Sequence, residues 1–113
     1  MSLDALDPVL VPPKRLAALG VLDAAKQVEF GFQRDYLGLS DSDLSKQLKA
    51  LTDAGYASSR RTGRGRSRKS WFSVTSDGSA ALAAHAAALR ALVSPVAAPT
   101  PPGDGAGAVP PVG

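Results

Sequence analysis

Residues 39–56 read LSDSDLSKQLKALTDAGY, and this stretch decides the fold. Ser40 can accept a hydrogen bond from a backbone amide as the N-cap of a helix, and the acids in the next turn favour the positive N-terminal end of that helix. Gly55 is a natural helix stop. The stretch therefore predicts a helix that begins after Ser40 and ends near Ala54.

The predicted helix has one apolar face and one cationic face. The apolar face carries Leu44, Leu48 and Leu51. Nearly opposite lie Ser42, Ser45, Lys46 and Lys49. Hydroxyl and ammonium groups can donate to base edges and phosphates, so this face suits the major groove of duplex DNA, with Ser40 at its start. Taken alone, the same pattern is typical of an ordinary solvated helix.

Upstream of this helix the sequence predicts two more helices. Two prolines at 12 and 13 suit a first helical turn, and leucines at helical spacing then predict a helix over 14–25. A short β-prone stretch, 28–30, leads into a second short helix that ends near Leu37, with Gly38 as its stop. A short helix, a tight turn and a polar-faced helix form the order of a helix-turn-helix.

Downstream, two short extended segments, 56–61 and 70–74, flank the glycine- and arginine-containing connector 62–69. This pattern predicts a hairpin with a long basic tip. Thr75 or Ser76 can cap a last helix, rich in Ala and Leu, that runs to about Val93.

The charge of the chain is strongly polarised. Residues 44–70 hold eight basic residues and one acid, a net charge of +7, although the whole chain carries only +3. The basic residues of the hairpin are Arg60, Arg61, Arg64, Arg66, Arg68 and Lys69. A loop that serves only solubility would carry charges of both signs. The single sign of these charges therefore indicates a polyanionic partner.

Residues 3–93 resemble the small MarR-like winged-helix regulators. The resemblance is carried by LSDSDLSKQLKALTDAGY at 39–56 and by WFSVTSDG at 71–78, which follows the basic hairpin. It implies a dimeric DNA-binding repressor or activator, in which residues 40–54 form the recognition helix and the hairpin forms the wing.

Two positions depart from the family pattern. Family members often have Arg and His where this chain has Lys46 and Gln47, so a half-site preference cannot be carried over. The residue after Gly78, commonly Arg in the family, is Ser79, which affects only a surface contact.

An apolar stripe with few bulky groups runs along the last helix and predicts a dimer seam, with the leading segment 3–11 and the first helix as partners. The residues expected at the interface are Leu3, Leu6, Leu82, His85, Ala86, Leu89 and Val93. A monomer could instead fold this helix onto its own core. His85 lacks partners at metal-ligand spacing, so we expect it to pack or cap rather than bind a metal.

Several functions are disfavoured. The chain has no cysteine, no nucleophile–base pair and no phosphate-cradling motif, so we expect neither an enzyme, a metal site nor a cofactor. The N-terminus lacks the basic start of a secretory signal, and no apolar run could span a bilayer, so we expect a soluble cytoplasmic protein. Five aromatic residues could line an effector pocket, but core packing is their default role.

The sequence thus predicts a mainly α protein with a small β-hairpin wing (α+β), a winged helix-turn-helix with an added C-terminal dimerisation helix. We expect a DNA-binding domain over 1–93, with the dimerisation helix at 76–93, and a disordered Pro/Gly/Ala-rich tail over 94–113. The predicted partner is double-stranded DNA. Alternatives are a protein-interaction module and RNA binding through the hairpin; the operator, the sign of regulation and any small-molecule effector are not specified.

Overall fold

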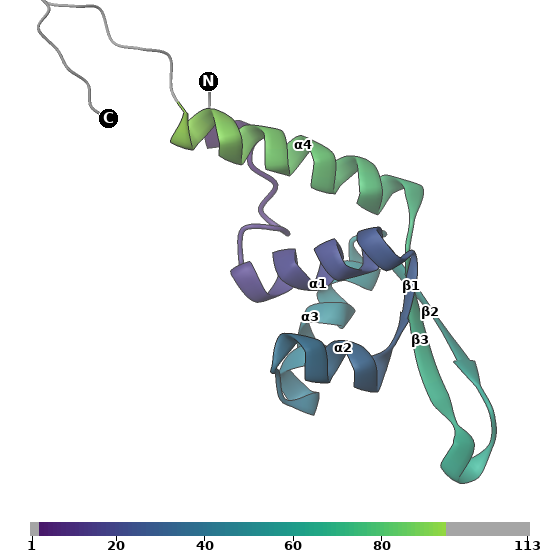
Figure 1. Ribbon diagram of the computed structural model, residues 1–113. Helices are drawn as coiled ribbons and strands as arrows, with labels where there is room; N and C mark the ends of the chain where they lie inside the picture. Colours follow the sequence, from purple (N-terminus) through teal and green to yellow (C-terminus); the bar gives the residue numbers. More distant parts are fainter. Residues whose placement is uncertain (1–2, 95–113) are drawn as a thin grey trace, which may run out of the picture.

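The computed structural model describes residues 3–94, which form four α-helices, a three-stranded sheet and two short 3-10 turns. In chain order the elements are η1 (Leu3–Ala5), α1 (Pro13–Ala25), β1 (Gln27–Glu29), α2 (Phe30–Leu37), α3 (Asp41–Asp53), β2 (Ala57–Thr62), η2 (Gly65–Ser67), β3 (Lys69–Val74) and α4 (Ser76–Val93). In Figure 1, α4 lies across one end and the β2–β3 hairpin projects from the other, with α1, α2 and α3 between them. The predicted α+β class is confirmed.

Three helices begin at a side chain that accepts hydrogen bonds from the first turn. Glu29 accepts from the amides of Gly31 and Phe32 at α2, Ser40 accepts from Asp43 at α3, and Thr75 accepts from Gly78 at α4. The first amides of a helix have no partner within it, so each cap satisfies donors that would otherwise be exposed to water or left unpaired. The caps predicted at Ser40 and Thr75 are confirmed, whereas the sequence did not predict the cap that Glu29 forms at α2.

The sheet has the order β1-β3-β2, and both pairings are antiparallel. The sequence predicted only the β2–β3 hairpin and an isolated β-prone stretch. In the structure that stretch, Gln27–Glu29, pairs with the base of β3 and places Val28 opposite Phe72. An isolated hairpin is marginally stable in water, so β1 ties the hairpin to the connection between α1 and α2.

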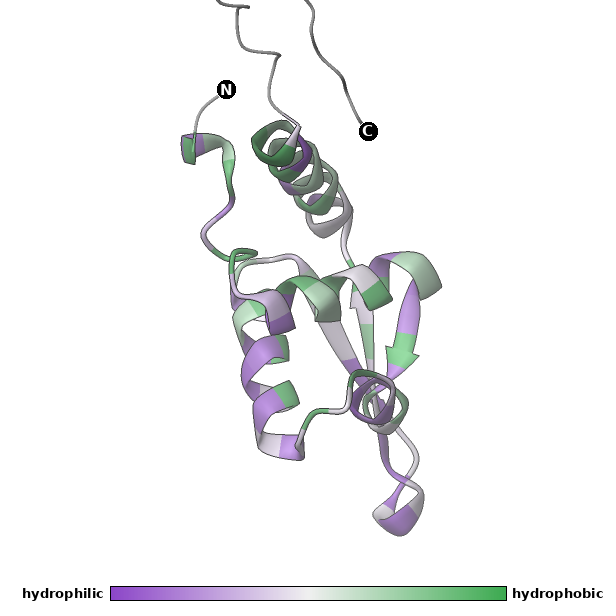
Figure 2. Cartoon of the chain, turned by 60° about the vertical axis from the view of Figure 1, so that its left-hand side comes forward, coloured by the Kyte–Doolittle hydropathy of each residue, from purple (hydrophilic) through white to green (hydrophobic). Residues whose placement is uncertain are grey.

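The core lies between α1, α3 and the base of the sheet. Its fully buried large side chains include Leu19 and Leu22 from α1 and the three leucines of α3. Leu10, Val28 and Ala57 complete it from the flanking segments. Each buried leucine contributes roughly 1.5–3 kcal/mol relative to exposure, and this burial fixes which side of α3 faces solvent. Figure 2 shows hydrophilic residues along the outer side of α3 and at the hairpin tip.

The start of α4 is docked on the turn that follows α3. The amide of Thr75 donates to the carbonyl of Tyr56 over 3.1 Å, and the Thr75 hydroxyl donates to the carbonyl of Gly55 over 2.6 Å. Gly78 lies so close that a Cβ there would meet the Tyr56 carbonyl oxygen at 2.1 Å. Only glycine permits this approach, so Gly78 is required where α4 begins against Tyr56.

Asp7 links the N-terminal segment to both of these elements. Its amide donates to Nδ1 of His85 on α4 over 3.0 Å, and its carboxylate accepts from the hydroxyl of Tyr56. The hydrogen bond to Asp7 holds the pKa of Tyr56 above its ordinary value. Asp7 therefore fixes the N-terminal segment beside α4.

Candidate nucleic-acid interface

The structure places the predicted polar face of α3 in solvent. Ser42, Ser45, Lys46 and Lys49 are all exposed, while the leucines of the same helix are buried. Lys49 pairs with Asp53 over 3.0 Å, whereas Lys46 makes no ion pair within residues 3–94. The exposed face can therefore offer hydroxyl and ammonium donors to a ligand outside the protein.

The N-terminal turn of α3 is held by neighbouring helices. Ser40 is exposed, but its hydroxyl is engaged as the cap, so its first role is structural. Asp41 accepts from Arg34 on α2 over 2.8 Å, and Asp43 accepts from Lys14 on α1 over 2.6 Å. The hydrogen bond from Lys14 holds the pKa of Asp43 below its ordinary value. These pairs join the start of α3 to α1 and α2.

Gln47 does not belong to the exposed face of α3. It is 6% exposed, accepts from Nε of Arg15 over 3.1 Å and donates to Asp43 over 3.1 Å. Gln47 departs from the family pattern together with Lys46, and the structure gives it an internal position, because its side chain joins α1 to α3.

The hairpin has two faces that divide its arginines. Side chains alternate along a strand, so Ala57, Ser59 and Arg61 share one face of β2. Ala57 is buried in the core, and Arg61 therefore lies on the side of the sheet that faces α3. Arg60 lies on the other face, where its guanidinium reaches Gln27 over 3.4 Å. From the sequence, Arg60 and Arg61 were both expected to bind DNA as part of the wing. The alternation of side chains along a strand would have predicted that they face opposite sides of the sheet.

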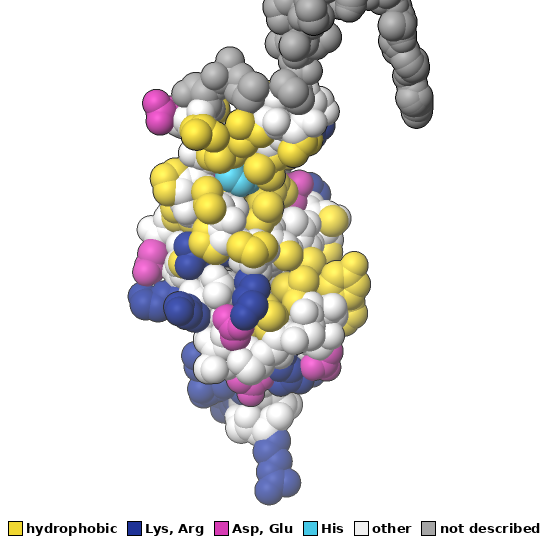
Figure 3. All heavy atoms as spheres, turned by 90° about the vertical axis from the view of Figure 1, so that its left-hand side faces the viewer, with side chains coloured by type: hydrophobic (Ala, Val, Ile, Leu, Met, Phe, Trp, Pro, Cys, Tyr) yellow, Lys and Arg dark blue, Asp and Glu magenta, His cyan; other side chains and the backbone are white. Residues whose placement is uncertain are grey.

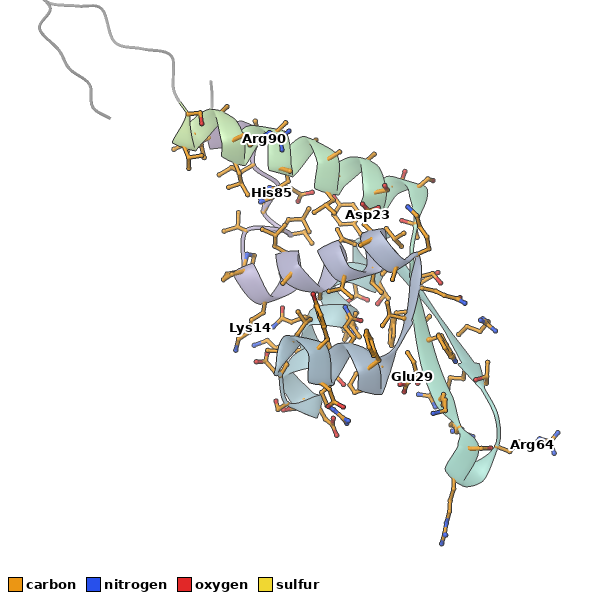
Figure 4. The ribbon with its side chains drawn as sticks, viewed as in Figure 1. Lys14, Asp23, Glu29, Arg64, His85 and Arg90 are labelled. Carbon is orange, nitrogen blue, oxygen red and sulfur yellow. The ribbon has the colours of Figure 1, made fainter. Side chains whose placement is uncertain are left out.

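The tip of the hairpin is a defined turn. Gly63 has φ of +81°, and a Cβ there would meet the Ser67 carbonyl oxygen at 2.2 Å. The Ser67 hydroxyl accepts from the Arg64 amide over 3.2 Å and donates to the Arg64 carbonyl over 2.8 Å. This turn exposes four basic side chains: Arg64, Arg66, Arg68 and Lys69. In Figure 4 the Arg64 side chain extends away from the tip into solvent.

A cleft of about 440 Å³ separates α3 from the sheet. Its lining consists of Phe30, Ser45, Leu48, Lys49, Thr52, Asp53, Ser59, Arg61, Ser70 and Phe72. Aromatic and aliphatic side chains form part of this lining. Hydroxyl groups lie on both sides of the cleft, with Lys49 on the α3 side and Arg61 on the side of the sheet. Sequence reasoning did not predict this cleft, because it depends on the distance between α3 and β2.

The opposite end of the molecule is apolar. We call this surface the apolar end and define it by Leu3, Leu6, Leu89, Leu92 and Val93, from the N-terminal segment and the end of the α4 helix that packs on it. Two of its side chains are strongly exposed: Leu3 at 69% and Val93 at 77%. In Figure 3 hydrophobic side chains gather over the N-terminal segment and α4, while Lys and Arg side chains dominate towards the hairpin.

The residues predicted at a dimer seam are only partly at this surface. Leu3 and Val93 are exposed, and Leu6, Ala86 and Leu89 are half-buried. Leu82 packs against the protomer's own core. His85 is 1% exposed and accepts a hydrogen bond from the Asp7 amide, so its surface is already covered by its own chain (Figure 4). The structure thus gives His85 an internal packing role, and its place at a dimer interface stays a prediction.

Residues 3–94 hold neither a metal-binding cluster nor a membrane-spanning helix. Among residues 3–94, no group of three or more His, Cys, Asp or Glu side chains is placed to hold a metal ion. No helix within the same residues is long and apolar enough to cross a membrane. The predicted tail falls outside the described residues, apart from Ser94.

Comparisons with known proteins agree with this arrangement. A structure of a transcriptional regulator homologue from Pyrococcus horikoshii OT3 is 19% identical, with a TM-score of 0.71 over 75% of this chain and 84% of that chain. A possible transcriptional regulator for arsenical resistance is 24% identical, with a TM-score of 0.61 over 86% of this chain and all of the other (100%). ZitR from Lactococcus lactis, a zinc-responsive MarR family member, is 23% identical, with a TM-score of 0.58 over 78% of this chain and 60% of that chain. At these identities the likeness shows the fold alone.

A search of curated proteins gave no match. A family model described as the winged helix DNA-binding domain matches residues 14–93, which run from the first turn of α1 to the last residue of α4. That match covers most of the chain and includes α3, the hairpin and the cleft between them. The chain belongs to the family of winged helix DNA-binding domains.

Proposed function

We propose that this protein is a sequence-specific transcriptional regulator that binds duplex DNA as a homodimer. One observation carries the proposal: the exposed polar face of α3 and the basic hairpin flank one cleft, on the part of the molecule away from the apolar end. A helix of this kind fits the major groove, and the wing then lies over the adjacent backbone and minor groove.

The proposed contacts divide into two kinds. Ser42, Ser45 and Lys46 read base edges, because they are the exposed donors nearest the N-terminal half of α3. Lys49 and the wing residues Arg61, Arg64, Arg66, Arg68 and Lys69 bind phosphates. Arg60 faces away from α3 and contributes less. Phosphate contacts supply salt-dependent affinity, and base contacts supply the sequence preference.

The apolar end is the proposed dimer interface. Large hydrophobic side chains exposed together at one end of a small protein are typical of an interaction surface. Pairing two copies about a two-fold axis through α4 and the N-terminal segment would cover this surface and leave both α3 helices free. We further propose that the dimer represses transcription by occupying its site, since a domain of this size acts most simply by blocking access.

Two variants test the division of contacts. Lys46→Ala is expected to change which base pair is preferred at one position of the site. Arg64→Ala is expected to weaken binding to all duplex sequences about equally. It should also reduce the slope of log K against log salt by about one phosphate contact. Fluorescence anisotropy with matched and mismatched duplexes measures both, and an Arg64→Ala protein with unchanged affinity and slope would remove the wing tip from the interface.

The experiment that tests the function is selection of the full-length protein against a random duplex library at near-physiological salt. An enriched inverted repeat with half-sites about one helical turn apart is expected. Binding at low salt without any enriched sequence would contradict specific regulation, because purely electrostatic binding is weakened by salt and ignores sequence. A promoter carrying the enriched repeat, transcribed in vitro with and without the protein, then tests repression.

RNA binding is a second candidate, favoured by one observation. Phe32 and Tyr36 on α2 are 59% and 70% exposed, and aromatic side chains can stack on unpaired bases. Their rings stack on each other, with centroids 6.0 Å apart and an interplanar angle of 13°, and they lie outside the wing. Competition between the enriched duplex and a single-stranded RNA of equal length decides between the two candidates: stronger binding to the RNA would favour the second.

A further inference from the structure

Asp53 is an acid in an otherwise cationic part of the interface. It is the single Asp or Glu between residues 44 and 70, where the chain carries eight basic residues. It is the last residue of α3 and lines the cleft between α3 and the wing. The Lys49 ammonium lies 3.0 Å from the Asp53 carboxylate, and the two side chains are 75% and 65% exposed.

Helix stability does not account for an acid at this position. The C-terminal end of a helix carries partial negative charge, so a carboxylate in the last turn is unfavourable there, and a basic residue would be favoured. The last turn of α3 contains no basic residue that would compensate. The pair with Lys49 is exposed on both sides, and such pairs contribute little to stability.

The cleft has the chemistry of a phosphodiester site. Its walls present Lys49 and Ser45 from α3 and Arg61 and Ser70 from the sheet. Arg61 and Ser70 are directly paired across β2 and β3, so their side chains lie on the same face of the sheet. If α3 occupies the major groove and the wing occupies the neighbouring minor groove, the strand that separates these grooves passes over the cleft.

We propose that Asp53 limits the affinity of the protein for DNA. By pairing with Lys49, Asp53 keeps this lysine away from the DNA backbone. Asp53 also places a negative charge at the position that a DNA phosphate would approach. The proposal rests on the function proposed above, because it assigns a role within the same interface. The occupant of the cleft is a phosphodiester of the DNA backbone, held by Lys49 and Arg61 once the pair with Asp53 opens.

The test is the variant Asp53→Asn in the full-length protein, with Asp77→Asn as the matched control. Asp77 lies in the exposed first turn of α4 and does not line the cleft, so this variant makes the same change in net charge at another place. We expect Asp53→Asn to bind both selected and random duplexes roughly three- to tenfold more tightly at about 0.15 M salt, the size of one screened surface charge interaction. We also expect its salt slope to steepen by about one phosphate contact.

A double-mutant cycle with Lys49→Gln separates the two effects of Asp53. In the Lys49→Gln background the gain from Asp53→Asn should shrink, because there is no longer a lysine to release. Equal gains from Asp53→Asn and Asp77→Asn would overturn the proposal in favour of a general charge effect. Unchanged affinity and slope in Asp53→Asn, with the wild type binding its duplex, would overturn it while leaving the proposed function standing; a wild type that binds no DNA would instead overturn the proposed function.

Discussion

Single residues in this protein take their roles from the direction of the side chain more than from its charge. Arg60 and Arg61 are neighbours with identical chemistry, yet one reaches Gln27 on the outer face of the sheet and the other lines the cleft beside α3. Lys46 and Gln47 are neighbours on α3, yet one is exposed and the other is 6% exposed. Each pair shows that one step along a strand or helix decides which surface of the molecule a side chain faces.

This difference in direction makes Arg60 and Arg61 a matched pair for mutation. Arg61→Ala should weaken binding to the selected duplex by about tenfold or more, because a hydrogen bond to a charged group is worth ~1.5–3 kcal/mol. Arg60→Ala should change affinity by much less, although it removes the same charge. Anisotropy titrations at one salt concentration measure both; equal losses would show that the two faces of β2 are equivalent towards DNA.

A second prediction at the scale of single residues concerns the response of Glu29 to acid. Two backbone amides, that of Gly31 foremost, donate to Glu29 at the start of α2 and hold its pKa below its ordinary value. A lowered folded-state pKa means that the carboxylate stabilises the fold fully above the ordinary glutamate value of about 4.3, and that this contribution is lost as the pH falls through the lowered pKa.

Glu29→Gln should therefore be less stable than the wild type at pH 7, by roughly 1 kcal/mol in the free energy of unfolding, as for other N-cap losses. The gap should close as the pH is lowered towards 3, because the wild-type carboxylate becomes protonated. Urea unfolding at the two pH values measures this difference. A gap of the same size at both would show that the charge of Glu29 contributes nothing.

At the scale of elements, the sequence predicts where the helices begin and end, but it does not predict how the helices and strands pack against one another. The caps at Ser40 and Thr75 and the stop at Gly38 are local signals, and the helices they bound lie within a residue or so of the predicted limits. The pairing of β1 with β3 joins residues more than forty positions apart in the sequence, so no local pattern predicts it. The sequence did not predict the cleft for the same reason: α3 supplies five of its ten lining residues, and the distant strands β2 and β3 supply two each.

The junction between α4 and the turn after α3 offers a test at this scale. Gly78→Ala should destabilise the protein by about 1–3 kcal/mol, since a Cβ would meet the Tyr56 carbonyl oxygen at 2.1 Å and the backbone must shift. Gly20→Ala is the control: it lies within α1 with nothing within 4 Å of the added Cβ, and alanine favours a helix over glycine by roughly 0.5–1 kcal/mol. Thermal unfolding should move the two melting temperatures in opposite directions, and a Gly78→Ala protein as stable as the wild type would mean that α4 is not held by this contact.

At the scale of the whole molecule, the separation of charged and apolar ends is the feature that connects fold and function. The sequence located the basic hairpin and the apolar stripe, because charge and hydropathy are properties of the residues themselves. It could not tell which residues of the α4 stripe remain exposed: Leu82 and His85 pack within the chain itself, and Val93 is left at 77% exposure. Which residues stay exposed depends on how η1 and α1 pack against α4.

The last prediction follows from this exposed end. Changing both Leu3 and Val93 to Asp places two charges on side chains that are 69% and 77% exposed, so the protomer should fold with an unchanged circular dichroism spectrum. If the apolar end joins two copies, the variant should be a monomer by light scattering at concentrations where the wild type is a dimer. It should also bind an inverted repeat no better than a single half-site, because the second half-site then gains nothing from linkage. Phe32→Ser, at 59% exposure on α2, is the control and should remain dimeric. A double variant that stays dimeric, or a Phe32→Ser protein that becomes monomeric, would move the interface away from α4 and the N-terminal segment.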